Sequence, residues 1–85
     1  MENVIPTVKD YILTTFLQGE DPSNLTPSTE LIRSGILDSL ATLDLVAFLE
    51  SKFGIELAAH DVDASNLGTL QDIDRLVRSK LAARA

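Results

Sequence analysis

Asp38 and Ser39 are the residues whose types and position could carry chemistry, because they stand together between two apolar runs. A serine hydroxyl serves as a hydrolytic nucleophile only beside a general base, and His60 is the only histidine. No G-x-S-x-G sequence surrounds Ser39, and no sheet is expected that could carry such an elbow. We therefore predict no catalytic residue, and we interpret His60 as a solvated residue of an acidic turn. Aspartate and serine are both good N-cap residues, which explains one of the two without any function.

The composition limits the remaining chemistry. The chain has 85 residues, which make one domain at most, spanning residues 1–85. It has no cysteine, so disulfides and thiolate metal sites are excluded and no metal is predicted. Any sulfur nucleophile in this protein's chemistry must therefore come from outside its side chains.

The charge and the hydropathy pattern restrict the partners and the location. Acidic residues number 13 against 7 basic ones, and the net charge of −6 disfavours nucleic acid and anionic membranes and favours basic partners. No apolar run is long enough to cross a membrane, and the N-terminus lacks the basic start and apolar stretch of a secretory signal. We therefore expect a cytoplasmic protein that does not insert into membranes.

The first helix is expected from about Val4 to Leu17, where apolar residues recur at helical spacing. Asn3 can cap its start, and Pro6 falls in the first turn, where a missing N–H group does little harm. Gly19 is expected to end this helix.

Residues 19–38 form a long connection that is rich in glycine, proline, serine and asparagine. Thr26 and Pro27 could start a single helical turn within it. A connection of this length is usually functional or disordered, and its recurring apolar residues predict that it is pinned to the core. These residues are Leu25, Leu31, Ile32, Ile36 and Leu37.

Three more helices are expected after the connection. The second covers about residues 39–53 and is ended by Gly54. A short third helix covers about residues 61–67, and the last runs over about residues 70–83, capped by Thr69. The fold class predicted is all-α: a small four-helix bundle of three main helices and a short third one, with a long loop between the first two helices.

The second helix has two apolar faces. One stripe at the spacing of a core-facing helix consists of Thr42, Leu45, Val46, Leu49 and Phe53. The other stripe is expected to remain in water, because so thin a bundle cannot bury both. It consists of Leu40, Leu43 and Ala47, edged by Asp38, Asp44 and Glu50. An exposed apolar ridge rimmed by charge indicates a docking surface. The alternative, which composition alone favours, is that this is the central helix, covered by neighbours on several sides.

The sequence GILDSL of residues 35–40 resembles the attachment motif of acyl carrier proteins and of the related peptidyl and aminoacyl carriers. Asp-Ser-Leu alone is a weak motif, but the similarity covers about residues 4–82 and includes the chain length and the acidic charge. Further residues fall where the family has them: Leu31, the segment Phe53-Gly54-Ile55-Glu56, and the segment from Asn66-Leu67 to Thr69-Leu70.

The resemblance implies a carrier and not an enzyme. Ser39 would carry 4′-phosphopantetheine through a phosphodiester, with Asp38 and Leu40 as the neighbouring cofactor-binding residues. A phosphopantetheinyl transferase takes this arm from coenzyme A and supplies the base and the metal. The thiol of the arm holds the cargo as a thioester, which agrees with the missing cysteine. A helix N-terminus is also a favourable place for a phosphate.

In the family, the second helix and the loop before it form the main partner surface. By position, Leu40, Leu43 and Ala47 would supply apolar contacts, while Asp44 and Glu50, together with the acid at the helix entrance, would steer basic partners. The partners implied are the transferase, an acyl- or aminoacyl-loading (adenylating) enzyme, and a downstream acyltransferase or condensing enzyme. Each is bound weakly, and the carrier is expected to be a monomer.

The cargo stays open between an acyl group and an aminoacyl group, such as D-alanine loaded by an adenylating enzyme. Carriers of fatty acid synthesis usually have more acids where Ala41 and Ser51 stand, so we expect a specialised pathway and not housekeeping fatty acid synthesis. The bulky Phe48 is expected to reduce the interior room for a long acyl chain.

Met1 and the compact boundaries favour a stand-alone carrier. The alternative of another class is a helical adaptor that binds partners non-covalently, with Ser39 only a helix cap.

Overall fold

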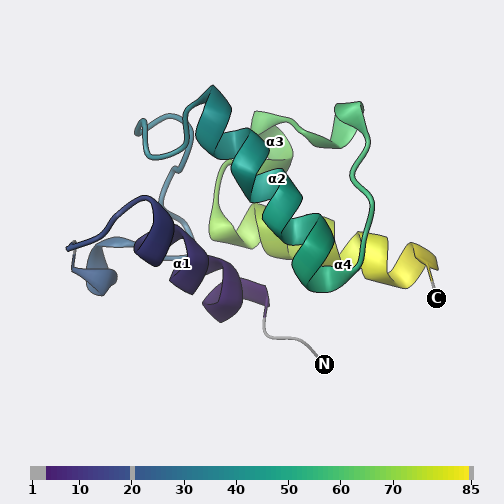
Figure 1. Ribbon diagram of the computed structural model, residues 1–85, viewed down its shortest axis with the longest axis horizontal. Helices are drawn as coiled ribbons and strands as arrows, with labels where there is room; N and C mark the ends of the chain where they lie inside the picture. Colours follow the sequence, from purple (N-terminus) through teal and green to yellow (C-terminus); the bar gives the residue numbers. More distant parts are fainter. Residues whose placement is uncertain (1–3, 20, 85) are drawn as a thin grey trace.

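The computed structural model describes residues 4–19 and 21–84, and in this part of the chain it contains helices and no strands (Figure 1). The helices are α1 (Val4–Thr15), α2 (Ser39–Phe53), α3 (Ala64–Leu67) and α4 (Leu70–Arg84), with the 3₁₀ turns η1 (Pro22–Asn24) and η2 (Ala59–Asp61) between them. This confirms the predicted all-α bundle of three main helices and a short third one. None of the described helices is long and apolar enough to cross a membrane.

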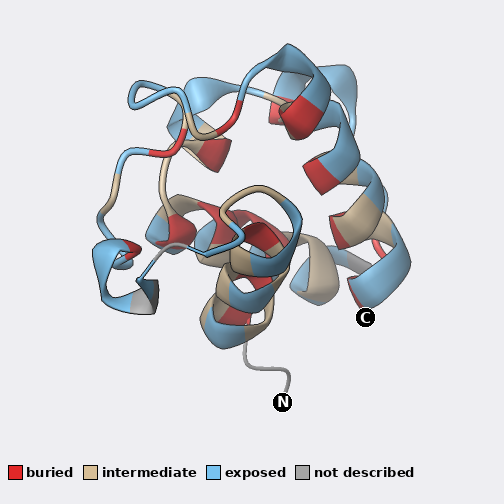
Figure 2. Cartoon of the chain, turned by 60° about the vertical axis from the view of Figure 1, so that its left-hand side comes forward, coloured by how far each residue is buried: buried red, intermediate tan, exposed pale blue. Residues whose placement is uncertain are grey.

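The helix α4 is the common support of the bundle, because α1, α2 and α3 all pack against it. In Figure 1, α2 crosses in front of α4 and α1 lies to one side of them. The buried positions turn toward the inside of the bundle, and the outer surfaces of the helices are exposed (Figure 2). Val4, Val8 and Ile12 of α1 are buried, as are Ile73 and Val77 of α4.

The helix α1 is shorter than predicted. It ends at Thr15 and not at Leu17, because the N–H groups of Phe16 and Leu17 both donate to the carbonyl oxygen of Ile12, at 2.9 and 3.2 Å. The chain then turns at Gly19, whose φ is +86°. The predicted cap, Asn3, lies outside the described residues.

The core face of α2 is rotated relative to the prediction. Its buried residues are Ala41, Leu45, Leu49 and Phe53, whereas Thr42 and Val46 are only half-buried. Phe48 lies beside this buried face and is covered by α1: the ring of Tyr11 stacks on Phe48 with the centroids 3.9 Å apart and the planes at 11°. The contact with α1 thus covers the side of α2 that carries Phe48, where the sequence pattern alone indicates no neighbour.

Two local elements differ from the predictions. Residues 61–67 are not one helix: the non-helical Val62, with φ −85° and ψ 82°, separates η2 from α3. Asp63 then caps α3 by accepting a hydrogen bond from the N–H of Ser65 at 3.2 Å. Thr26 starts a hydrogen-bonded turn and not a helical one, and the helical turn of this connection is η1.

Candidate functional site

The long connection is pinned to the bundle as predicted, and it delivers the chain to the start of α2. Leu25, Leu31 and Leu37 are all buried, with exposed fractions of 2% or less. Backbone hydrogen bonds tie the connection to the corner between α3 and α4. The N–H group of Leu31 donates to the Gly68 carbonyl at 2.7 Å, and that of Gln71 donates to the Pro27 carbonyl at 3.1 Å. The residue before α2 is therefore fixed by both packing and backbone pairing.

Gly35 makes the last turn before the site possible. Its φ is +86°, in the left-handed region that side chains other than glycine adopt at a cost. The turn brings the N–H group of Leu37 to the Leu31 carbonyl at 2.9 Å, so both leucines face the core. Asp38 and Ser39 follow at the surface.

Asp38 is the N-cap of α2. Its backbone is extended, with φ −85° and ψ −172°, and its Oδ1 accepts a hydrogen bond from the N–H of Ala41 at 2.8 Å. Its carbonyl accepts from the N–H of Thr42 at 2.8 Å and from the Thr42 hydroxyl at 2.7 Å. Asp38 is therefore the cap of α2. The alternative that makes Ser39 the helix cap is wrong on this point. Ser39 is the exposed first residue of the helix.

The start of α2 is suited to a phosphate group. The first N–H groups of a helix have no carbonyl acceptor within it, and the helix dipole places partial positive charge at this end. Asp38 uses its side chain on Ala41 and not on the N–H groups of Ser39 and Leu40. An exposed hydroxyl at this position can therefore hold a phosphodiester whose charge the backbone stabilises.

A largely apolar groove of about 520 Å³ begins at Ser39. Its walls come from three elements: the long connection, the first turns of α2, and the segment between η2 and α3. The lining residues are Ile32, Leu37, Asp38, Ser39, Thr42, Leu43 and Val62. A flexible substituent on the Ser39 oxygen thus has an apolar surface beside it. The residues present fit a phosphopantetheine arm, which joins a phosphate to a chain with apolar carbons and amide groups.

The predicted outer stripe of α2 is exposed. Leu40 and Leu43 are 75% and 61% exposed, and Ala47 is exposed as well, so the alternative of a central helix whose neighbours on several sides also cover this stripe is wrong. Asp44 is exposed on the side of α2 that faces α1; burial and the nearby Asp44 carboxylate raise the pKa of Tyr11. The stripe and this acid are therefore available to a partner.

Two other predicted surface positions behave differently. The carboxylate of Glu50 already has a partner within the chain, because its Oε2 accepts a hydrogen bond from the N–H of Leu57 at 2.9 Å. Ala41, which we compared with acidic positions of other carriers, is buried on the core face of α2. The other compared position, Ser51, is exposed. Of Ala41 and Ser51, only Ser51 therefore lies where an acid would change the surface charge of α2.

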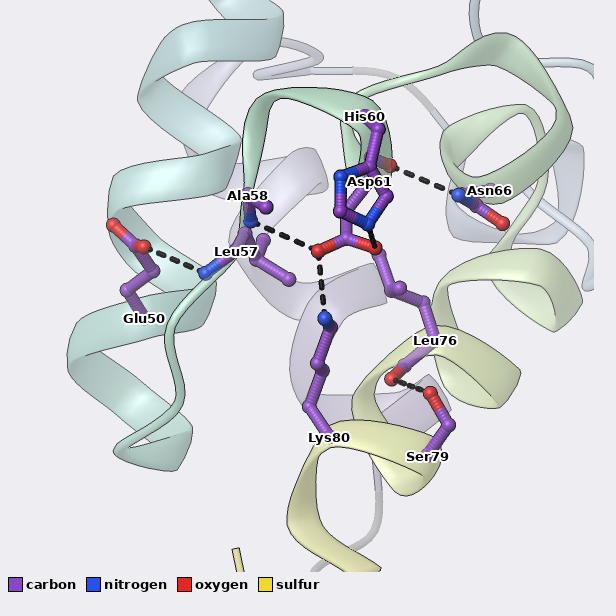
Figure 3. A network of polar contacts seen from close by, with 9 residues as sticks. All are labelled: Glu50, Leu57, Ala58, His60, Asp61, Asn66, Leu76, Ser79 and Lys80. Atoms are coloured by element: carbon purple, nitrogen blue, oxygen red, sulfur yellow. Dashed lines mark hydrogen bonds and ion pairs between the residues drawn. The ribbon is translucent and has the colours of Figure 1, made fainter. Parts of the chain in front are cut away.

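The structure contains a polar network around Asp61 that was not predicted from the sequence (Figure 3). Asp61 is the buried charged residue of the described part, and its Oδ2 lies 2.7 Å from Nζ of Lys80 and accepts from the N–H of Ala58 at 2.8 Å. Asn66 donates to the Asp61 carbonyl at 3.1 Å. The Lys80 and Ala58 donors lower the pKa of Asp61. His60 is 83% exposed beside it, with Nε2 3.6 Å from Oδ1, which confirms His60 as a solvated residue.

Comparison with known proteins bears directly on this site. A family model described as "Phosphopantetheine attachment site" matches residues 13–73, a range that contains Ser39 and every residue of the groove. An acyl carrier protein of Thermosynechococcus vestitus (strain NIES-2133 / IAM M-273 / BP-1) is 33% identical over 63 residues, which cover 74% of this chain and 75% of that protein. A probable acyl carrier protein, PigG, of Serratia sp. (strain ATCC 39006) is 33% identical over 69 residues, covering 81% and 78%.

Proposed function

The chain belongs to the acyl carrier protein family and has its phosphopantetheine attachment domain, and we propose that Ser39 is the residue that receives the 4′-phosphopantetheine arm. The observation that carries this proposal is the division of roles at the start of α2. Asp38 caps the helix, and the neighbouring hydroxyl is left exposed at the positive end of the helix dipole. The groove that begins at the same residue supports the proposal.

The residues of the chain bind and orient the arm, and they do no chemistry on the cargo. When bound, the arm supplies a terminal thiol that holds the cargo as a thioester. The N–H groups at the start of α2 stabilise the phosphate, and Leu37, Leu43 and Val62 offer apolar contact along the groove. The protein is then a substrate of a phosphopantetheinyl transferase and not an enzyme itself.

Carrier proteins of this family interact with phosphopantetheinyl transferases and with biosynthetic enzymes, and the exposed stripe of α2 is the surface we assign to them. Leu40, Leu43 and Ala47 supply apolar contact, and Asp44 steers basic partners. For Glu50 we propose a lesser part, because its carboxylate already binds the N–H of Leu57. The partners proposed are a loading enzyme and a downstream acyltransferase or condensing enzyme.

We propose an acyl cargo, which the names of both similar acyl carrier proteins support, and a specialised biosynthetic pathway, which the absence of an acid at the exposed Ser51 supports. Thioester formation with a panel of adenylating enzymes, each supplied with an acyl or an amino acid, identifies the cargo. Loading by an amino-acid-activating enzyme alone would replace the acyl proposal with the aminoacyl alternative.

Intact mass spectrometry tests the attachment site. Incubation with coenzyme A and a broad-specificity phosphopantetheinyl transferase is expected to add the mass of one arm to the wild-type chain. Ser39→Ala is expected to abolish the addition, and Ser51→Ala, which removes an exposed serine of the same helix, is expected to preserve it. No addition to the wild-type chain, or an addition that survives Ser39→Ala, refutes the proposal.

The same variant separates the carrier from the non-covalent adaptor. Because Asp38 is the cap, Ser39→Ala is expected to change the free energy of unfolding by less than about 0.5 kcal/mol, whereas Asp38→Ala costs about 1 kcal/mol. A carrier loses its biological function with Ser39→Ala despite normal folding. An adaptor keeps its function in a complementation assay with that variant.

A further inference from the structure

One wall of the groove beside Ser39 is connected to a residue of α4 that does not line the groove. Val62 lines the groove, and it belongs to the segment between η2 and α3. Its own N–H group donates to the Ala59 carbonyl of the adjoining turn η2 at 3.2 Å, so this hydrogen bond does not attach it to α2 or α4. Val62 packs half-buried against the core, and the adjacent residue, Asp61, adds a polar attachment because its carboxylate meets Lys80 of α4.

The pair of Asp61 and Lys80 is placed to act as a tether. The Nζ of Lys80 lies 2.7 Å from Oδ2 of Asp61, and the two side chains are only 27% and 10% exposed. Figure 3 shows the Lys80 side chain rising from α4 toward the Asp61 carboxylate. Solvent and salt screen a partly buried pair less than a surface pair. The pair also spans 19 positions of sequence, so it joins two separate elements.

The other charged and polar groups near the tether reinforce it on the η2 side. The N–H of Ala58 donates to the same Oδ2, and His60 lies 3.6 Å from Oδ1. Asn66 of α3 donates to the Asp61 carbonyl. Asp61 therefore binds η2 through its carboxylate and α3 through its backbone carbonyl, and Lys80 connects the carboxylate to α4.

We propose that Lys80 is a positioning residue for the arm: by holding Asp61 against α4, it fixes Val62 as a wall of the groove that begins at Ser39. This inference rests on the proposed attachment at Ser39. It assigns to α4 a part in the site, although none of the groove-lining residues comes from that helix. Without the tether, the wall is free to move away from α2, and the arm loses contact with it.

Amide chemical shifts test the tether, because they report on contact with the arm without any partner enzyme. The ¹H–¹⁵N spectra of the chain before and after arm attachment are compared for the wild type and for Lys80→Met. In the wild type, attachment is expected to shift the amide signals of Leu40 and Val62. In Lys80→Met, the Val62 shift is expected to fall to less than half, while the shift of Leu40, next to Ser39, is retained.

Matched variants keep the test decisive. Lys80→Arg retains the charge and is expected to restore most of the Val62 shift. Arg75→Met removes another cation of α4, one that pairs at 2.7 Å with Asp72 on the same helix, and is expected to leave the shift unchanged. Asp61→Asn keeps an acceptor for Ala58 but removes the ion pair, and it serves as the second variant should Lys80→Met fail to fold.

The outcomes distinguish this inference from the proposed function. A wild-type chain that takes no arm overturns the attachment at Ser39 and the tether with it. Normal arm attachment with an unchanged Val62 shift in both Lys80→Met and Asp61→Asn overturns the tether alone. An equal loss of the shift in Arg75→Met also overturns it, because the effect would then come from a general change in α4.

Discussion

Residues 25–37 and residues 55–63 both contribute to the lining of the groove beside Ser39, and they are attached to the bundle in different ways. The first segment is held by buried leucines and by backbone hydrogen bonds to Gly68 and Gln71. The second has the buried Ile55 and the half-buried Leu57 and Val62 against the core, and it depends in addition on the carboxylates of Glu50 and Asp61.

The difference has a physical consequence. Backbone hydrogen bonds and apolar burial do not depend on the ionisation of side chains, so the first wall keeps its position over a wide range of pH. The second wall depends on two carboxylates and one ammonium group, and it responds to protonation and to single charge substitutions. The groove therefore has one fixed wall and one adjustable wall. Four substitutions or conditions test this contrast.

The largest effect is expected from Leu31→Ala, which breaks the fixed wall. Leu31 is completely buried, and truncation leaves a cavity, so we expect a loss of about 2–5 kcal/mol in the free energy of unfolding. Urea denaturation measures the loss. Leu43→Ala removes the same atoms from the exposed lining of the groove and is expected to cost less than about 0.5 kcal/mol. Equal losses would contradict the assignment of Leu31 to the core.

Gly35→Ala is expected to strain the fixed wall without changing its packing. No atom lies within 4 Å of the position that a Cβ would occupy, so the cost comes from φ at +86° alone. We expect a destabilisation of about 1–2 kcal/mol. Gly35→Asn is the control, because asparagine tolerates the left-handed region better and should lower the melting temperature less. A melting temperature unchanged in Gly35→Ala would show that the turn is not held in this conformation.

Glu50→Ala is expected to loosen the adjustable wall at its start. The variant removes the acceptor of the Leu57 N–H group, and a hydrogen bond of this kind contributes about 0.5–1.5 kcal/mol. Hydrogen exchange is the sharper measurement, since the Leu57 amide should lose its protection. The exposed Glu56→Ala removes an acid from the same segment and should leave that amide protected. Protection that persists in Glu50→Ala would mean that Leu57 has another acceptor.

The smallest effect is expected from acid. The folded-state pKa of Asp61 is lowered by the Lys80 and Ala58 donors, so its contribution to stability is complete above the unfolded pKa of about 3.9. It is lost as the pH falls through the lower, folded pKa. The melting temperature of Lys80→Met should lie below that of the wild type at pH 7, and the difference should shrink below about pH 4.

Circular dichroism followed from pH 7 to pH 3 measures this difference. Arg75→Met provides the matched comparison, because the Arg75 side chain is 72% exposed and its ion pair stays within α4. A difference between the wild type and Lys80→Met that stays constant with pH would show that Lys80 acts through its packing and not through Asp61.

The elements with local signals were predictable. Helical spacing, Gly54 as the C-cap and Thr69 as the N-cap of α4 were all anticipated, and the structure has Gly54 at φ +65° and the Thr69 hydroxyl accepting from the N–H of Asp72 at 3.1 Å. The GILDSL motif was equally visible, because its residues are consecutive, and Leu37 within it was expected to be pinned to the core.

What escaped prediction depends on contacts between distant residues. The rotated core face of α2 lies beside Phe48, which the ring of Tyr11 on a different helix covers. The pair of Asp61 and Lys80 joins residues far apart in sequence, and nothing in the segment around Asp61 marks it as buried. The sequence pattern also placed one helix over residues 61–67, where Asp63 in fact starts a shorter one.

The stacked rings of Tyr11 and Phe48 place the aromatic spectroscopic signals of the molecule in one part of the bundle. The chain has one tyrosine and no tryptophan, and its segment from residue 54 onward contains no phenylalanine, tyrosine or tryptophan. Tyrosine emission and near-ultraviolet dichroism therefore report on the contact between α1 and α2, while far-ultraviolet dichroism reports on all the helices. Label-free spectroscopy can thus show whether the half of the bundle that carries α3 and α4 melts together with the half that carries α1 and α2.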